Sequence, residues 1–426
     1  MRTKLLLTAA ALAAPIAIAQ PAFADPAKHQ FGDPIALDSD LSIDPMLDAR
    51  LRWEHVDQPT TDADAVTLRA RFGFEVKHKP SHLSFLAEAE GTVALDKNYN
   101  AFPFAVASSQ RRPQFSAVPD SENIELNRLQ LQYKSKAVTL TVGRQRINLD
   151  DQRWVGAAGW RQNEQTFDAV RGEAKFGPVS LDATYSISQR TVFGMDAEAR
   201  TAYDGHFVFL GAGTKLGPVN LKGFAYLLDY DPKENAGALA VALADTQTYG
   251  LRATGTFALS KPLKLNVALS YANQSNWKQN PVSYSANYYA AEAGLGFKGF
   301  TATAGWEKLG SDNGRAVQTP MATLHKFNGW ADLFLTTPNT GLQDAYGGLT
   351  YTFPGVKKLK GLNAQVLYHS YDSAVGSVHL GHEWDASIGV KTGKVAWLAK
   401  VADFKSSGLG GTVNTTKFWL QAEYAF

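Results

Sequence analysis

Polar and apolar residues alternate along most of the chain. From Val66 to Lys77 every even-numbered position is apolar and every odd-numbered position is polar, charged or glycine. A period of two is typical of a β-strand with one apolar and one polar face. The alternation recurs in residues 179–188, 249–257, 380–390 and 418–426. Such runs of about ten residues match tilted strands that cross a bilayer, so the pattern predicts an all-β membrane protein.

Short and long connections alternate between the predicted strands. The short ones fall at residues 79–81, 134–136, 176–178, 215–218, 260–262, 298–299, 354–361 and 392–394. The long polar ones fall near 94–122, 147–165, 191–204, 229–245, 272–285, 310–343, 372–378 and 406–414. Outer-membrane barrels have connections of unequal length in the same way, with short periplasmic turns and long extracellular loops.

The alternation also predicts the number of strands. Eight short turns separate nine hairpins, which gives one antiparallel up-and-down barrel of 18 strands from near Leu47 to Phe426. Residues 326–335 would make a nineteenth strand, but bacterial single-chain barrels have even numbers. We therefore assign residues 328–334 to a large outer loop that folds into the mouth or lumen.

A soluble β-protein would alternate in the same way. Its exposed face would carry more charge, whereas the polar face here is often Ser, Thr, Gly, Asn or Gln, as expected for a water-filled interior. Aromatic residues also recur near strand ends, among them Trp53, Tyr133, Trp306 and Tyr424. These features favour a membrane barrel with interfacial aromatic girdles, whose 18 strands enclose an aqueous channel unless loops block it.

The N-terminus predicts the location. Arg2 and Lys4 precede an apolar stretch from Leu5 to Ala19, and residues 22–24 form an A-x-A cleavage site. The apolar stretch is too short for a transmembrane helix. We predict a cleaved signal peptide at 1–24, a periplasmic segment at 25–45 and the barrel at 46–426, in the outer membrane of a Gram-negative cell.

Composition excludes several function classes. The chain has no cysteine, which excludes disulfides, thiolate metal sites and a cysteine nucleophile. Its net charge is +2, and loss of Arg2 and Lys4 with the signal would make the mature chain formally neutral. Neither the net charge nor a basic tail favours a nucleic-acid partner.

Catalytic motifs are weak. Residues 294–299 match G-x-G-x-x-G by letters, but they cross a predicted hairpin and no helix follows. The nine histidines are scattered and no G-x-S-x-G elbow is present, so His206 and His369 cannot be paired with a serine from the sequence. We expect no catalytic residue, no metal and no cofactor, with a lipase-like barrel enzyme as the less favoured alternative.

One part of the chain resembles a known family. Residues 142–147, 150–156 and 160–171 are similar to the signature of the alginate-export family of outer-membrane proteins, and residues 326–332 and 338–344 match further. The resemblance implies an 18-stranded monomeric barrel whose electropositive lumen conducts anionic polysaccharide, and it includes Asp332 among the channel residues. Residues 424–426, ending at Phe426, resemble the C-terminal signal read by the barrel-assembly machinery.

Arginines provide a mechanism for that function. Strand parity places Arg50, Arg52, Arg69, Arg71, Arg128 and Arg171 on the polar face, and the loop at 147–165 adds Arg153 and Arg161. Guanidinium groups bind carboxylates bidentately and stay charged, so a row of them would attract a uronate chain. Asp168, Glu88 and Glu90 are expected to share the lumen and to orient these arginines.

The later strands weaken this interpretation. Their predicted inward residues include Asp182, Glu292, Glu307, Glu383, Asp385 and Glu423 against Lys222, Arg252 and Lys264. This half of the lumen would be acidic or balanced. A porin for small or mixed-charge solutes therefore stays as the alternative, and any single arginine can equally be part of a structural ion pair.

Arg144 and Arg146 stand apart from the other arginines. Counting from Val138 places both on the lipid face, where an arginine costs roughly 2–4 kcal/mol at the midplane. Either the strand has ended, or Gly143 forms a bulge that shifts the register. The family resemblance favours the bulge and a place in the channel for both arginines.

Overall fold

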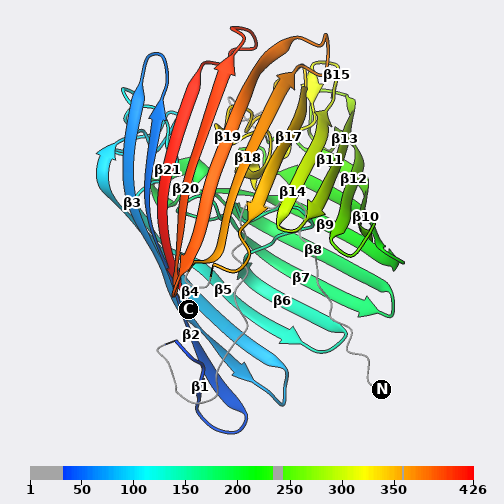
Figure 1. The fold of residues 1–426 in the computed structure, drawn as a ribbon. Helices are drawn as coiled ribbons and strands as arrows, with labels where there is room; N and C mark the ends of the chain where they lie inside the picture. The colour runs from blue at the N-terminus through cyan, green and yellow to red at the C-terminus, as the bar shows by residue number, and fades with distance from the viewer. Residues whose placement is uncertain (1–31, 234–242, 357–358) are drawn as a thin grey trace.

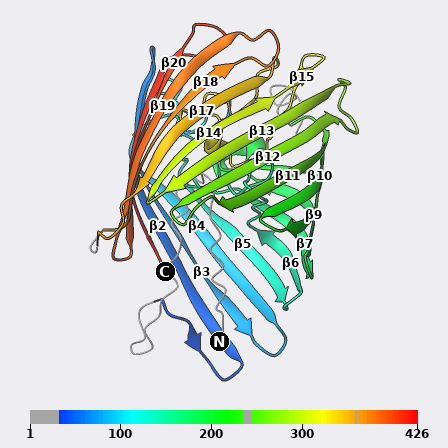
Figure 2. The ribbon, with the colours of Figure 1, turned by 45° about the vertical axis from the view of Figure 1, so that its right-hand side comes forward.

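The barrel is closed and has 18 strands. The computed structural model describes residues 32–233, 243–356 and 359–426, so the predicted signal peptide lies outside the described residues. Each strand pairs antiparallel with the next, and β21 pairs with β2 to close the cylinder (Figures 1 and 2). The predicted all-β up-and-down architecture is confirmed.

The barrel strands are β2 (Leu41–Asp57), β3 (Asp62–His78), β4 (Leu83–Asn98), β5 (Asn123–Lys134), β6 (Val138–Gln145), β7 (Thr166–Phe176), β8 (Val179–Arg190), β9 (Ala202–Leu216), β10 (Val219–Tyr230), β11 (Thr246–Ala258), β12 (Leu263–Asn276), β13 (Ser285–Phe297), β14 (Phe300–Leu309), β17 (Leu342–Thr352), β18 (Lys360–Asp372), β19 (His379–Thr392), β20 (Val395–Ser406) and β21 (Thr415–Ala425). The smaller elements are β1 (Ile35–Ala36), β15 (Ser311–Asp312), β16 (Arg315–Ala316) and the 3-10 helices η1 (Met195–Arg200) and η3 (Leu324–Lys326). None of the described helices is long and apolar enough to span a membrane.

The first strand begins earlier than expected. Strand β2 starts at Leu41 rather than near Leu47, because residues 41–46 pair with the end of β3 from Gly73 to His78. The C-terminus reaches only to Leu47, whose carbonyl accepts a 3.0 Å hydrogen bond from the amide of Phe426. The β2–β3 hairpin therefore extends beyond β21 at the short-turn end (Figures 1 and 2).

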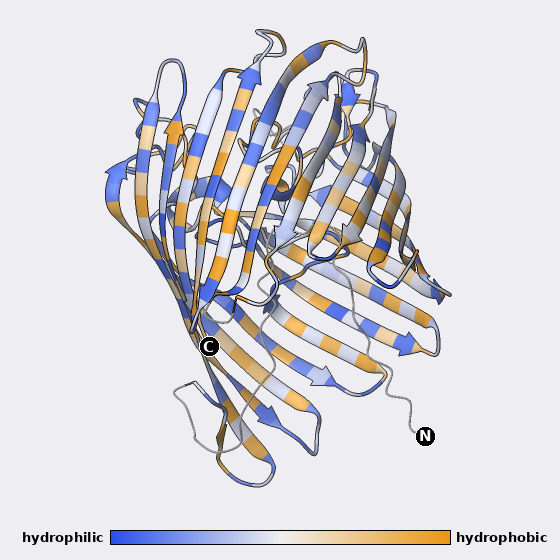
Figure 3. Cartoon of the chain, viewed as in Figure 1, coloured by the Kyte–Doolittle hydropathy of each residue, from blue (hydrophilic) through white to orange (hydrophobic). Residues whose placement is uncertain are grey.

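Alternation sorts the side chains between lipid and lumen. On β3, Arg69 and Arg71 are buried, whereas Leu68 and Phe72 are 39% and 54% exposed. The hydropathy bands of Figure 3 repeat this along the strands. Because the exposed face is apolar and the buried face carries the charges, the barrel is suited to lipid outside and polar groups inside.

Two long loops fold into the barrel. We call residues 146–165, between β6 and β7, the first lumen loop, and residues 310–341, between β14 and β17, the second lumen loop. The second contains the segment that was assigned to the mouth or lumen, and Trp330, Ala331 and Phe334 are buried there. That assignment is confirmed, since residues 327–341 form no strand.

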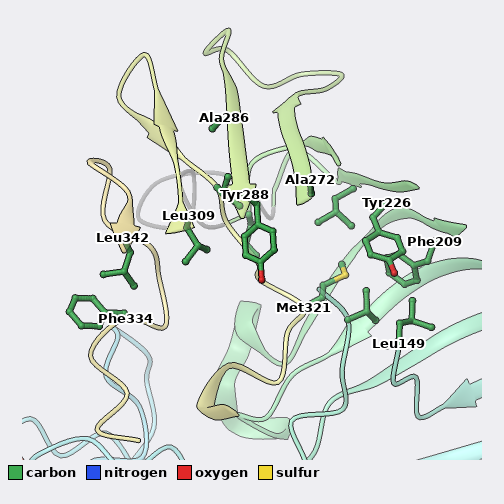
Figure 4. Packing of buried hydrophobic residues seen from close by; sticks show 14 of the residues in the cluster. Leu149, Phe209, Tyr226, Ala272, Ala286, Tyr288, Leu309, Met321, Phe334 and Leu342 are labelled. Atoms are coloured by element: carbon green, nitrogen blue, oxygen red, sulfur yellow. The ribbon is translucent and has the colours of Figure 1, made fainter. Parts of the chain in front are cut away.

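Part of the lumen is dry. A single buried cluster joins Leu149 of the first loop and Met321 of the second to Phe209 and Tyr226 of β9 and β10, several of which Figure 4 shows. The same cluster reaches Trp419 of β21, far around the barrel from β9. The expected aqueous interior is therefore blocked by loops in this region, because the loops carry apolar side chains that meet inward aromatic residues.

Candidate functional site

The first lumen loop lies against a row of arginines on the early strands. Arg50 donates hydrogen bonds to the carbonyl oxygens of Gly159, Trp160 and Arg161 at 3.0–3.2 Å. Arg52 donates to the Trp160 carbonyl at 2.6 Å. On β3, Arg71 donates to the Gln162 carbonyl at 3.3 Å. These guanidinium groups therefore satisfy backbone acceptors that the loop brings into the lumen.

Carboxylates neutralise the same arginines. Arg50 pairs with Glu423 at 3.2 Å, and Arg69 pairs with Asp48 and lies 3.7 Å from Glu423. Arg71 pairs with Glu90 and, at 3.2 Å, with Glu164 of the loop. The side chains of Arg52 and Arg69 are fully buried. The predicted inward direction of these arginines is correct, but in this conformation Arg50, Arg52 and Arg71 hold a loop rather than face open solvent.

Arg128 and Arg171 also point inward, as predicted. Arg128 pairs with Glu88 at 2.7 Å, and Arg171 pairs with Asp182 and, at 3.0 Å, with Glu173. Neither donates a hydrogen bond to the described part of the first lumen loop. Both side chains keep about a sixth of their surface exposed, which is more than the arginines of β2 and β3 keep.

The second lumen loop lies against acidic residues of the later strands. The Glu383 carboxylate on β19 accepts hydrogen bonds from the amides of Trp330 and Ala331 at 2.5 and 2.8 Å. Glu307 on β14 binds Arg153 at 2.8 Å and accepts from Asn328 at 2.7 Å. The predicted acidic character of this half is present, and it is used to bind amide groups of the loop.

Gly329 allows this close approach. Its φ of +80° lies in the region that favours glycine. A β-carbon there would collide with the Glu383 carboxylate and the Tyr371 hydroxyl. The absence of a side chain lets the next two amides reach Glu383.

Arg161 and Asp332 join the two loops. Arg161 of the first loop donates to Asp332 of the second at 2.7 Å and pairs with Glu54 of β2 at 3.1 Å. Asp332 also lies 2.8 Å from His325 and 3.5 Å from Lys417. Burial alone would raise the pKa of Asp332, but these cations and His325 hold it well below its usual value. Both residues were predicted from the sequence as channel residues, but their contact with each other was not.

Lys400 of β20 lies in the barrel wall and contacts residues at the same joint. Its Nζ atom lies 2.7 Å from Nε2 of His325, and within 3.7–5.3 Å of the ring centres of Trp160, Trp330 and Trp419. Burial lowers the pKa of His325 well below its usual value, so the ring is neutral and can accept from Lys400. Lys400, Lys417 and His325 were not predicted from the sequence. Inward parity on β20 and β21 was the available signal for the two lysines.

Arg144 and Asp168 lie on the outer face, which corrects two predictions. They form a bidentate pair at 2.7 and 2.8 Å. Arg144 is in register with Leu129, which is 41% exposed, and follows Val142, which is 44% exposed. No register shift occurs at Gly143. The two charges neutralise each other, which reduces the cost of placing them outside.

Arg146 lies in the lumen because the strand has ended before it, and not because Gly143 forms a bulge. Strand β6 ends at Gln145, so parity no longer applies to Arg146. Its guanidinium binds Glu164 at 2.8 Å, and Arg71 lies on the same carboxylate. Burial alone would raise the pKa of Glu164, but Arg146 and Arg71 hold it well below its usual value.

Among the described residues, two of the cavities lie beside the loops. The larger, about 490 Å³, lies at the short-turn end among Arg171, Lys222 and the lysines of two turns, Lys134, Lys136 and Lys175. We call it the basic vestibule. Its acidic lining residues are Asp150, Glu173 and Asp182. The smaller, about 130 Å³, lies beneath the second lumen loop among Arg252, Glu292, Glu307, Asp344 and His369.

The comparisons agree with this architecture. The crystal structure of Pseudomonas aeruginosa OpdK with vanillate matches this chain with a TM-score of 0.68 and 13% sequence identity. The match covers 90% of this chain and 98% of that chain. Acinetobacter baumannii OccAB3 matches with a TM-score of 0.67 and 14% identity, over 90% and 99%. Pseudomonas aeruginosa OpdO matches with a TM-score of 0.65 and 15% identity, over 93% and 99%. At these identities the likeness concerns the fold.

The fold and the family together define the class. The protein is a β-barrel channel of the Gram-negative outer membrane. The family described as alginate export matches residues 47–345, and the chain belongs to that family. No curated protein matches the chain.

Proposed function

We propose that this channel passes small solutes that carry carboxylates. The basic vestibule is the observation that supports the proposal. It is lined by five cationic side chains and three carboxylates, and it has room for a monosaccharide-sized solute. Guanidinium and ammonium groups bind a carboxylate reversibly, and a channel requires contacts weak enough to release its solute.

The lumen loops support small solutes over polymers. They join Arg161 to Asp332 across the lumen and pack with inward residues from β9 to β21. A polymer would have to displace both loops, whereas a solute of one or two sugar units requires less space. OpdK has been crystallised with vanillate, a small aromatic carboxylate, which agrees with this size class.

Anionic polysaccharide is the second candidate substrate, and the family match favours it. It requires a conformation in which the two lumen loops leave the wall residues that now bind them. The arginines of β2 and β3 would then become accessible as a row of anion sites. Oligouronates of increasing length distinguish the two candidates, because only the polysaccharide channel would pass the longer chains.

Selectivity measurements in planar bilayers test the proposal. With a salt gradient, the reversal potential should show anion preference, and Arg171→Gln should reduce it. Arg144→Gln is the matched control, because Arg144 also pairs with a strand aspartate but faces outward. A cation-selective or unselective wild-type channel would overturn the proposal, as would equal effects of the two substitutions. Swelling of protein-containing liposomes in glucuronate and in oligouronates then reports the size limit.

The proposal includes no catalytic step. His206 hydrogen-bonds Tyr185 at 2.6 Å, and His369 lies 3.0 Å from Asp344, so both have partners other than serine among the described residues. We further propose that the protein acts as a monomer in outer-membrane lipid. We also propose that the barrel-assembly machinery recognises Phe426.

A further inference from the structure

The eight short turns contain or adjoin a lysine, and they contain no acidic residue. The connecting residues at 79–82, 135–137, 177–178, 217–218, 259–262, 298–299, 353–359 and 393–394 contain neither Asp nor Glu. A lysine lies within each turn or close to it: Lys79, Lys136, Lys175, Lys215, Lys261, Lys298, Lys360 and Lys394. We call this end of the barrel the short-turn rim. In outer-membrane barrels it faces the periplasm.

Most of these lysines have no ion-pair partner among the described residues. Within the described residues, no carboxylate lies within 4 Å of Lys136, Lys175, Lys215, Lys261 or Lys298, and all are exposed. The sector at β2 and β3 is the exception, because Lys77 binds Asp44 and Glu75 there. The positive charge is therefore concentrated along the turns from β5 to β14.

The opposite end of the barrel has a different balance. At the long-loop rim, Lys97, Lys233, Lys278 and Lys405 lie within 4 Å of Glu122, Asp204, Asp229 and Asp403, respectively. Further acidic residues there include Asp57, Asp62, Asp196, Asp231 and Asp312. The two mouths of the channel therefore present different charges to a solute.

We infer that the short-turn rim captures carboxylate-bearing solutes from the periplasmic side, so that anions enter the channel preferentially from that side. The inference rests on the proposed function. Clustered charge at a channel mouth raises the local concentration of the opposite ion and its rate of entry, by roughly 10-fold to 1,000-fold. At the long-loop rim an anion meets paired lysines and additional carboxylates beside Arg111 and Arg112. Entry from outside therefore has a weaker attraction.

The vestibule indicates a solute rather than a lipid as the occupant. Lysines at the edge of a barrel also lie near phosphate groups of the inner leaflet. However, Lys134, Lys136 and Lys175 line the basic vestibule. Arg171 and Lys222 lie further inward and are paired with Glu173, Asp182 and Asp150, so the five cations of the lining still outnumber its three carboxylates. A site for headgroups alone would not require cations inside the barrel. The continuous arrangement from rim to interior suits an anion that moves along it.

The test uses the refolded full chain in planar bilayers. Because the chain has no cysteine, Leu409→Cys in a long loop gives a unique label that reports the orientation of each channel. Glucuronate currents are recorded with the salt on either side, at low and high ionic strength. The variant Lys134→Gln/Lys136→Gln/Lys175→Gln is compared with the matched control Lys233→Gln/Lys278→Gln/Lys405→Gln at the other rim.

At low ionic strength, wild-type glucuronate entry should be faster from the short-turn side. The vestibule variant should reduce that entry by about tenfold and leave entry from the other side unchanged. High ionic strength should remove the difference, since screening shortens the range of surface charges. The control variant should keep the fast entry from the short-turn side.

Three results would overturn the inference. The first is equal glucuronate entry from both sides in the wild type. The second is a difference between the sides that survives in the vestibule variant. The third is a vestibule variant that differs from the wild type only in its insertion into anionic-lipid vesicles. The last result would assign the lysines to phosphate headgroups. Anion-selective reversal potentials with symmetric entry would overturn this inference alone, whereas loss of anion selectivity would overturn the proposed function.

Discussion

The early and late walls of the barrel bind their loops with opposite chemistry. On β2 and β3, arginines donate to loop carbonyls, as Arg52 does to Trp160. On β19, Glu383 accepts from the loop amides of Trp330 and Ala331. The charge asymmetry along the sequence therefore serves first to satisfy loop backbone inside the lumen. Any role in conduction depends on which of these groups solute can reach.

The largest effect is expected where the two anchored loops meet. Asp332→Asn removes the charge that pairs with Arg161 and Lys417, and breaking a buried pair costs about 3–5 kcal/mol. The loops should separate, which would raise single-channel conductance and expose residues 310–341 to protease. Asp168→Asn is the control, because it removes a carboxylate from the outer face. Wild-type conductance in Asp332→Asn would show that the joint does not hold the loops.

A substitution at Gly329 tests the acidic wall alone. Gly329→Ala puts a β-carbon against the Glu383 carboxylate at a φ of +80°. Such strain costs about 1–3 kcal/mol before the collision is counted. Gly376→Ala is the matched control, with a φ of +82° and no neighbour nearer than 3.9 Å. Protease sensitivity of the second loop should rise only in Gly329→Ala, and equal sensitivity would contradict the close approach.

Arg52 tests the basic wall alone. Arg52→Met removes the bond to the Trp160 carbonyl and those to Gln421, and hydrogen bonds to charged groups contribute about 1.5–3 kcal/mol. The first loop should loosen, which is measured by a lower melting temperature and noisier channel current. Arg128→Met serves as the control, because it removes an inward arginine that has no described hydrogen bond to that loop. Indistinguishable variants would mean that the loop does not depend on its arginine anchors.

The smallest effect concerns pH. His325 is neutral while buried, and its ordinary pKa of about 6.5 returns if the loop leaves. The released state therefore binds a proton more readily, and the anchored state should lose up to about 1.4 kcal/mol per pH unit between pH 6.5 and 5. Asp332 does not titrate in this window, because its pKa lies well below its usual value. Loop opening should rise on acidification in the wild type and stay flat in His325→Gln.

Most of the fold could be predicted because period-two alternation and turn chemistry are local. The strand number and the position of the second lumen loop followed from them. Asp168 could not be placed in this way, because its face depends on strand register and on pairing with Arg144. The joint of Arg161 and Asp332 also escaped prediction, since 171 positions separate them and only the folded loops bring them together.

The cluster around Lys400 gives the closed lumen an optical signature. It gathers three of the nine tryptophans, Trp160 from the first loop, Trp330 from the second and Trp419 from the wall. Each lies within contact range of one ammonium group in a dry setting. Movement of either loop would transfer indole rings to water and shift their emission to longer wavelength, so the untagged protein reports its own opening.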